Sequence, residues 1–189
     1  MNLRPLCSAP NVDVYFDSWN NFLYLEWAGE LQLAAVQQAC LEIARCFVAH
    51  AYPRVLNNNA QIVRVEPDVT PWLAQHFLPY LGLAGVQQFA WVYGPSPRGQ
   101  ELGQQVLRFL SPQVQVALFA DAEEAVAWLQ QMRPGYTSGC ELLPRPPAAQ
   151  HNAKLKFLLK SFEQEVAATR VAPAPATPAR SAGHSLLLQ

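Results

Sequence analysis

The spacing of apolar residues changes several times along the chain, and these changes restrict the fold more than any other sequence feature. In "NVDVYFD" (11–17) apolar and polar residues alternate, and "FLYLEWA" (22–28) is a second strand-like run rich in aromatics. From Gly29 the spacing becomes three and four residues, as on one face of an α-helix. The apolar positions of that helix are Leu33, Val36, Cys40, Ile43 and Phe47. These patterns predict a hairpin, turned at "SWNN" (18–21), followed by a helix of about five turns.

The alternation of strand and helix patterns continues up to residue 132. Strand patterns lie at 54–59, 89–94 and 114–120, and helix patterns lie at 70–85, 96–110 and 121–132. Thr70 is expected to cap the first of these helices, and Pro79 to end or kink it. The order β-β-α-β-α-β-α-β-α predicts an α/β fold with a mixed, mostly parallel five-stranded sheet, an opening hairpin and about four helices.

A shift in charge and composition divides the chain near residue 150. Residues 1–150 hold eight Arg, no Lys and twelve acidic residues, a net charge of −4, whereas residues 151–189 have a net charge of +3. Every lysine lies between Lys154 and Lys160. The predicted parts are an N-terminal arm (1–10), the α/β domain (11–132), a Pro/Gly-rich linker (133–150), an amphipathic basic helix (151–170) and an Ala/Pro-rich tail (171–189).

The composition narrows the classes of function. A net charge of −1 lacks the excess of positive charge that is typical of proteins that bind nucleic acid. The start "MNLRPLCSAP" lacks the apolar core of a signal peptide, and no apolar run approaches the length of a membrane span, so a cytoplasmic location is expected. The four cysteines show no CxxC spacing, so we expect neither a metal, a cofactor nor a disulfide framework.

The residues that could carry catalysis have simpler structural explanations. "GPSPRG" (94–99) stands at a strand-to-helix turn, but its two prolines remove donors that a phosphate site needs, and Ser96 is better explained as a helix cap. His76 lies alone in its helix pattern, and His50 lies near a helix end, where its cation suits the dipole. We therefore expect a protein that is not an enzyme.

A set of strand and helix aromatics allows two interpretations. They could line an apolar cleft, or they could fill the core, which we favour because aromatics are common in strands. Trp27 or Trp72 is the expected exception to core packing. The set consists of Tyr24, Trp27, Trp72, Phe89, Trp91 and Tyr93.

The helix predicted at 151–170 also allows two interpretations. Its apolar stripe has basic flanks, which fits an anionic membrane surface or an acidic partner protein. Alternatively, the helix docks on its own acidic domain, the interpretation we favour, because Glu163 and Glu165 dilute the positive charge. The residues concerned are Lys154, Leu155, Lys156, Leu158, Leu159, Lys160 and Phe162.

Several segments resemble the STAS-like domains, in particular the SpoIIAA-like group. The closest likeness is "LFADAEEAVAWL" (118–129), a strand followed by an acidic cap and a helix. "YLEWAGELQLAAVQQACLEI" (24–43), "RVLNNN" (54–59) and "FAWVY" (89–93) resemble the group as well. The resemblance covers about residues 10–132 and implies a small α/β domain that binds protein partners without catalysis of its own. Some relatives resemble lipid-carrier (CRAL-TRIO-like) proteins, which implies a carrier of an apolar ligand with peripheral membrane association as the alternative.

The run "RVLNNNAQ" (54–61) determines the predicted site. Asparagines after a strand serve either as a turn or as the rim of a site, and the end of a parallel strand is where open sheets bind. The resemblance implies a phosphorylated Ser or Thr in this loop, but no hydroxyl occurs here before Thr70. We expect a partner-binding surface without that phosphoswitch, formed by Asn57, Asn58, Asn59, Gln61 and Trp72.

Overall fold

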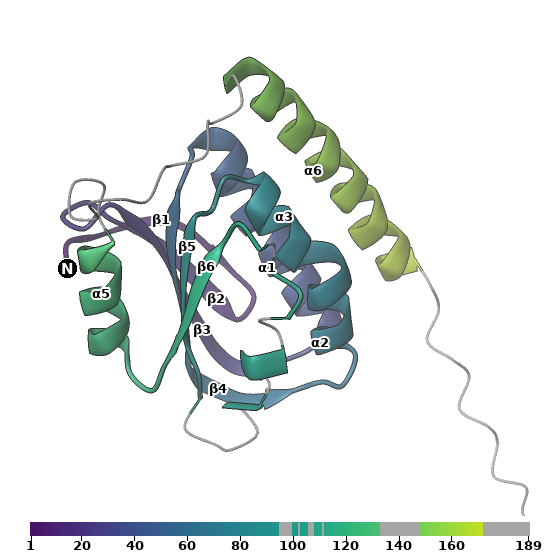
Figure 1. Ribbon diagram of the computed structural model, residues 1–189. Helices are drawn as coiled ribbons and strands as arrows, with labels where there is room; N and C mark the ends of the chain where they lie inside the picture. The colour runs from purple at the N-terminus through teal and green to yellow at the C-terminus, as the bar shows by residue number, and fades with distance from the viewer. Residues whose placement is uncertain (95–99, 102, 106–107, 111, 133–147, 172–189) are drawn as a thin grey trace, which may run out of the picture.

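One mixed sheet forms the centre of the computed structural model (Figure 1). The structure describes residues 1–94, 100–101, 103–105, 108–110, 112–132 and 148–171, with side chains of the last segment described from 153 to 168. The sheet has six strands in the order β1-β2-β3-β4-β5-β6. Their bounds are β1 Leu3–Ala9, β2 Val12–Asp17, β3 Phe22–Leu31, β4 Arg54–Val65, β5 Gln88–Val92 and β6 Gln115–Phe119. The first three strands pair antiparallel and the remaining pairs are parallel, which confirms the mixed, mostly parallel α/β sheet.

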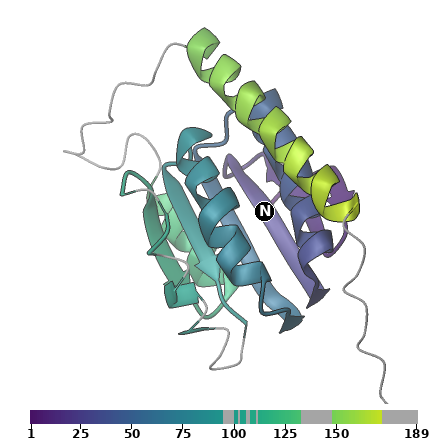
Figure 2. The same ribbon diagram turned by 90° about the vertical axis from the view of Figure 1, so that its right-hand side faces the viewer.

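The helices lie on both faces of the sheet. Their bounds are α1 Leu33–Ala49, α2 Val69–Trp72, the π-helix η1 Leu73–Phe77, α3 Leu78–Leu83, α5 Ala122–Gln131 and α6 Ala148–Val171. Helix α5 packs on β4, β5 and β6 from one side, whereas α1 and α3 cover the other side. Helix α6 lies outside the α1 layer and packs on it, as Figure 2 shows.

Strand β1 is the sixth strand and was not predicted. The segment expected as an N-terminal arm pairs antiparallel with β2, from Leu3 opposite Asp17 to Ala9 opposite Val12. Pro5 interrupts its strand pattern, but proline is tolerated on an edge strand, where one side makes no ladder bonds. The register shifts between Pro5 and Cys7, as it does at a β-bulge.

The helix predicted at 70–85 begins one residue earlier and passes through a π-helical turn. Its N-cap is Asp68, so the expected cap by Thr70 is wrong. Pro79 is the second residue of α3, immediately after η1. Proline removes a helical hydrogen bond and crowds the carbonyl of the preceding turn, and the wider π turn accommodates this without ending the helix.

Two apolar cores fill the space between the sheet and the helices. The larger core joins β2–β5 to α1, α3 and α6, and the smaller one lies beneath α5. Tyr24, Phe89 and Trp91 are buried, in agreement with core packing of the aromatics. Trp27 is also buried, whereas Trp72 is half-buried, so of the two expected candidates only Trp72 departs from full burial. The start of the helix predicted at 96–110, with Ser96, lies outside the described residues; residues 100–101 and 103–105 are helical.

Candidate functional site

The three asparagines lie inside strand β4 and not in a loop, so the predicted loop is wrong. Asn57 pairs with Leu25 of β3 and with Trp91 of β5, and β4 continues beyond the triplet to Val65. The side chains of Asn57, Asn58 and Asn59 are 5%, 7% and 7% exposed. Asparagine is disfavoured in strands, but its amide can be buried when both ends of it find partners.

On the α1 side of the sheet, asparagine amides connect three strands. Trp27 Nε1 donates to Asn57 Oδ1 over 2.9 Å, and Asn57 Nδ2 donates to Asn59 Oδ1 over 3.1 Å. Asn59 Nδ2 donates to the carbonyl of Val92 over 2.9 Å. This chain of hydrogen bonds runs from the middle of β3 through β4 to the end of β5 and holds the three strands together.

On the opposite side, a second chain of hydrogen bonds leads to the surface. Asn58 Nδ2 donates to the hydroxyl of Tyr24 over 2.9 Å, and that hydroxyl donates to Glu26 Oε1 over 3.1 Å. Gln61 Nε2 donates to the same carboxylate oxygen over 3.3 Å. Burial raises the pKa of Tyr24 to about 12, with Glu26 adding to the rise and the Asn58 hydrogen bond opposing it. Tyr24 therefore keeps its proton and orients the carboxylate of Glu26.

Above Glu26 lies a shallow open hollow of about 210 Å³. It forms where the β1–β2 turn approaches β3 and the second half of β4. This is the same face of the sheet on which α5 packs. Its lining residues are Ser8, Ala9, Asn11, Val12, Asp13, Glu26, Ala28 and Gln61. The carboxylates of Asp13 and Glu26 stand opposite one another in the β2–β3 register. The hollow is therefore rich in hydrogen-bond acceptors and suits a donor or a cation.

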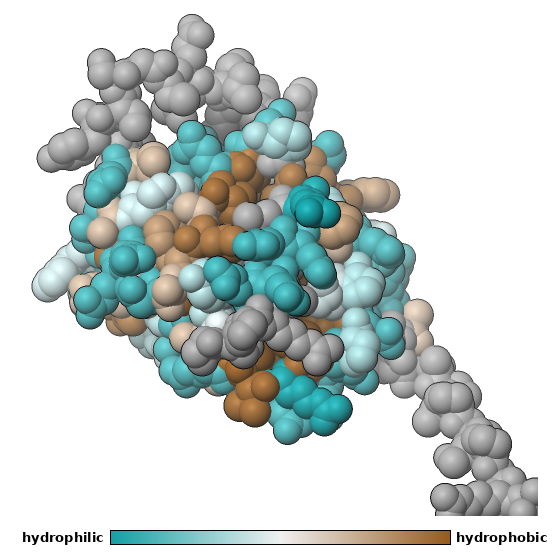
Figure 3. Space-filling view, turned by 60° about the horizontal axis from the view of Figure 1, so that its bottom comes forward, coloured by the Kyte–Doolittle hydropathy of each residue, from teal (hydrophilic) through white to brown (hydrophobic). Residues whose placement is uncertain are grey.

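The carboxyl end of β4 adds apolar surface next to these polar groups. Strand β4 pairs with β3 as far as Val65 but with β5 only as far as Asn58, so its last residues extend beyond β5. Val63, in this extension, is 79% exposed. Figure 3 views this end of the molecule and shows brown apolar areas beside teal polar ones.

Trp72 lies away from the other predicted contact residues. It stacks on His76 with ring centroids 5.6 Å apart, and it packs against Phe162 of α6 at 5.3 Å. Gln61 lines the hollow on the other face of the sheet. The structure therefore places Gln61 above the asparagines and Trp72 beneath α6, and it does not join them in one surface.

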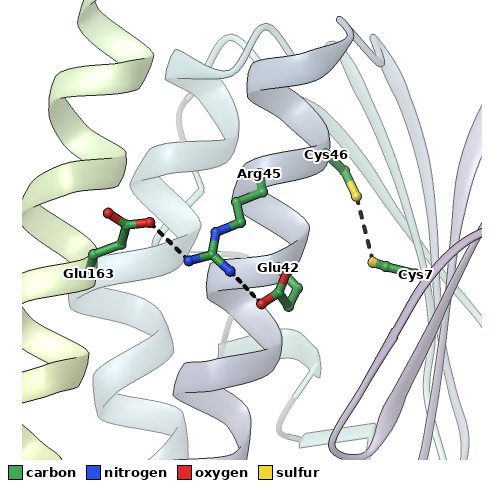
Figure 4. Close-up of polar contacts among 5 residues, drawn as sticks. All are labelled: Cys7, Glu42, Arg45, Cys46 and Glu163. Atoms are coloured by element: carbon green, nitrogen blue, oxygen red, sulfur yellow. Dashed lines mark hydrogen bonds and ion pairs between the residues drawn. The ribbon is translucent and has the colours of Figure 1, made fainter.

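Helix α6 docks on its own domain through its apolar stripe, and two of its glutamates form ion pairs beside that stripe. Leu155, Phe162 and Val166 are buried, and Leu158 and Leu159 are half-buried. Arg45 of α1 lies between Glu42, at 2.6 Å, and Glu163 of α6, at 2.9 Å, as Figure 4 shows. His76 Nδ1 lies 3.2 Å from Glu165 of α6. A membrane or partner contact by the exposed Lys154, Lys156 and Lys160 stays a prediction.

The residues of the hollow other than Gln61 were missed from the sequence. Asp13 and Glu26 occupy solvent-facing positions of two strands joined by a predicted hairpin. The hairpin register would have placed them opposite one another, so the pairing of two carboxylates was the available signal. The part of the chain that the structure describes brings together no three His, Cys, Asp or Glu side chains that could hold a metal ion. It also contains no helix that is long and apolar enough to cross a membrane.

Comparisons with known proteins give only distant structural likenesses. No family model matches the chain, and no curated protein matches it. An uncharacterized protein of the DUF3478 family from Shewanella loihica PV-4, described as having a SpoIIAA-like fold, aligns with 14% identity and a TM-score of 0.42, over 62% of this chain and 91% of its own. SiaC of Pseudomonas aeruginosa aligns with 12% identity and a TM-score of 0.40, over 63% of this chain and 100% of its own. The first description names the fold group that the sequence resembles, but likenesses this low carry no argument about function.

Proposed function

We propose that this chain is a non-enzymatic interaction or regulatory domain of SpoIIAA-like fold without the Ser/Thr phosphoswitch of the group it resembles. The observation that carries the proposal is the burial of the Asn57–Asn59 triplet inside β4 with its amides engaged. A phosphoryl acceptor must be an accessible hydroxyl, and residues 57–61 contain none. The asparagines serve instead to hold β3, β4 and β5 together and, through Tyr24, to orient Glu26.

The partner surface of this proposal is the hollow around Glu26 and its rim. Asp13, Glu26 and the carbonyl oxygen of Gln61 supply acceptors, so the partner would supply donors such as lysine, arginine or free backbone N–H groups. The predicted contact residue Gln61 belongs to this surface. A contact through Trp72 would require α6 to move, because Phe162 packs on its ring.

The alternative function, a carrier of an apolar ligand, has less support. The two best-formed hollows among the described residues measure about 210 and 190 Å³, and both are open to solvent. Pockets for small ligands usually span about 300–1,000 Å³ and enclose most of the ligand. The apolar stripe of α6 is also engaged with its own domain, which leaves less of it for a membrane.

A pair of matched charge changes tests the interaction surface. The variant Asp13→Lys/Gln61→Lys changes two exposed positions at the hollow, and Glu123→Lys/Gln131→Lys makes the same changes in charge on α5. Proteins that wild type and the α5 variant capture from host cells, but the hollow variant does not, are the expected partners. A purified partner should bind the hollow variant about ten-fold more weakly or worse. Equal binding by all three proteins would reject this surface.

Liposome flotation tests the alternative. The variant Lys154→Ala/Lys156→Ala/Lys160→Ala removes the exposed lysine charges of α6 and leaves its buried residues in place. Flotation of wild type with anionic vesicles, lost in this variant, would favour the carrier. The interaction domain predicts that neither protein floats.

A further inference from the structure

Two cysteines far apart in the sequence lie in contact at the junction of strand β1 and helix α1. The Sγ atoms of Cys7 and Cys46 are 3.7 Å apart, as Figure 4 shows. Cys7 follows the register shift of β1, and Cys46 lies in the last turn of α1. Both thiols are partly exposed. The bulge in β1 is therefore the feature that aims Cys7 at the helix.

We propose that Cys7 and Cys46 form a site of oxidative modification that closes to an intramolecular disulfide when it meets a small-molecule disulfide. In the first step the thiolate of one cysteine attacks glutathione disulfide, forms a mixed disulfide and releases one glutathione. In the second step the other cysteine attacks the mixed disulfide and releases the second glutathione. The two protein thiols lose two electrons to the reagent, and their two protons end on the two glutathione molecules that leave.

The geometry selects this pair among the described cysteines. A disulfide needs an S–S distance near 2.0 Å, which two thiols already in van der Waals contact reach by small side-chain rotations. The partial exposure of Cys7 and Cys46 gives the reagent access. Cys40 is fully buried in the core and offers neither access nor a second thiol. Cys140 lies outside the described residues.

The surroundings of the two thiols make the closure slow near neutral pH and faster in alkali. Burial raises the pKa of Cys46 to about 12, and burial also raises the pKa of Cys7. The carboxylate of Glu42 raises both pKa values further, and that of Asp13 adds to the rise at Cys7. Thiolate is the attacking species, so the rate should increase with pH. Among the described residues, the charged and titratable groups near the pair are Asp13, Glu42 and Tyr52, and Arg4 and His50 lie near Tyr52.

The bond would tie the edge strand β1 to the core helix α1. Cys7 and Cys46 are 39 residues apart in the sequence, so the bond would close a long loop in the unfolded chain. A cross-link of that length restricts the unfolded chain strongly and stabilises the fold. Oxidation should therefore raise the melting temperature, on the order of 10 °C if the bond forms without strain.

The test uses the full chain treated with glutathione disulfide at pH 7 and pH 9. We expect a Cys7–Cys46 linked peptide in a non-reducing digest, faster formation at pH 9, and a higher melting temperature that returns to its starting value on reduction. Cys140→Ser should behave in the same way, and its intact mass should fall by two hydrogens. Cys7→Ser and Cys46→Ser, each combined with Cys140→Ser, should gain one glutathione at most and show no such rise.

Three outcomes would overturn the proposal. The first is a wild type whose thiols stay free, or carry only glutathione, after prolonged treatment at pH 9. The second is a digest in which Cys7 or Cys46 is linked to Cys140 or to a second copy of the chain. The third is a wild type that forms the bond but melts at a lower temperature. Such a bond would strain the fold, and the folded structure would then not be arranged to form it. All three outcomes are measured on the wild type, with the reduced wild type as the folded reference. They can therefore be measured even if a serine variant fails to fold.

Discussion

The indole Nε1 of Trp27 donates a hydrogen bond to Oδ1 of Asn57 over 2.9 Å, and both side chains are buried. The variant Asn57→Ala leaves this indole N–H without its partner and also removes the donor to Asn59 Oδ1. A buried polar group that loses its partner costs about 1–3 kcal/mol. We expect a loss of that size in the free energy of unfolding, measured by urea denaturation.

A double-mutant cycle separates this hydrogen bond from lost packing. Trp27→Phe removes the indole donor, so the combined Trp27→Phe/Asn57→Ala variant should lose less stability than the sum of the two single variants. Gln61→Ala, at an exposed position of the same strand, should stay within about 0.5 kcal/mol of wild type. Strict additivity of the single changes would contradict a direct coupling.

The carboxylate of Asp17 should make the stability depend on pH in the acid range. Burial alone would raise its pKa, but hydrogen bonds from the side chain of Asn20 and from the backbone N–H groups of Asn2, Asn20 and Trp19 outweigh burial and lower it below 3.8. A lowered folded-state pKa means that the contribution is present above the unfolded-state pKa and is lost as the pH falls through the folded-state value.

Urea denaturation of wild type and Asp17→Asn between pH 7 and pH 2 measures this contribution. The difference in stability should be largest at neutral pH and should shrink from about pH 4 downward, since both states of wild type bind the proton at lower pH. A difference that stays constant over the whole range would show that Asp17 acts through its shape and not through its charge.

Helix α6 offers a matched pair of phenylalanines for testing its docking. Phe162 is 9% exposed and packs on Trp72 and Phe77, whereas Phe157 on the same helix is 73% exposed. Phe162→Ala should cost about 3–5 kcal/mol, and Phe157→Ala less than about 0.5 kcal/mol, by chemical denaturation. Limited proteolysis should also cut near α6 faster in Phe162→Ala. Equal stability of the two variants would mean that α6 is not docked in solution.

Arg54 gives a fourth prediction, because its guanidinium is buried and joins three segments. It donates to the carbonyl of Leu129 at the end of α5 and to the carbonyls of Asn20 and Asn21 in the β2–β3 turn. Lysine keeps the charge but cannot reproduce the planar fork. Arg54→Lys should lower the free energy of unfolding by about 1–3 kcal/mol, whereas Arg64→Lys, at an exposed position of the same strand, should change it little. Equal effects at the two positions would contradict a structural role for the fork.

The sequence predicted the order of the described elements from β2 to α5 because the helices carry an apolar stripe and the strands carry alternating or continuous apolar residues. Asp121 illustrates a local signal that holds in the structure: its side chain accepts from the backbone N–H of Glu124 at the start of α5. Strand β1 was not predicted because its residues show no alternation of apolar and polar side chains. Pro5 interrupts the strand, and most of its residues lie exposed at the edge of the sheet. The triplet in β4 escaped because the partners that let asparagine be buried, Trp27 and Tyr24, come from another strand.

The candidate site was predicted only in part for a similar reason. Gln61 was named because it follows the strand in sequence, but Asp13 and Glu26 reach the same hollow through strand pairing. Trp72 was named because it lies at the start of the helix that follows β4 in sequence. Its contact with Phe162 depends on a helix about 90 residues away, and no local pattern encodes that contact.

The ion pairs of the α6 glutamates have a consequence for how the molecule meets others. Glu163 and Glu165 lie against Arg45 and His76, whereas Lys154, Lys156 and Lys160 are exposed. The acidic hollow lies on the far face of the sheet. A charged neighbour would therefore be attracted by one of these regions and repelled by the other before any atoms touch, and both effects would weaken as salt is added.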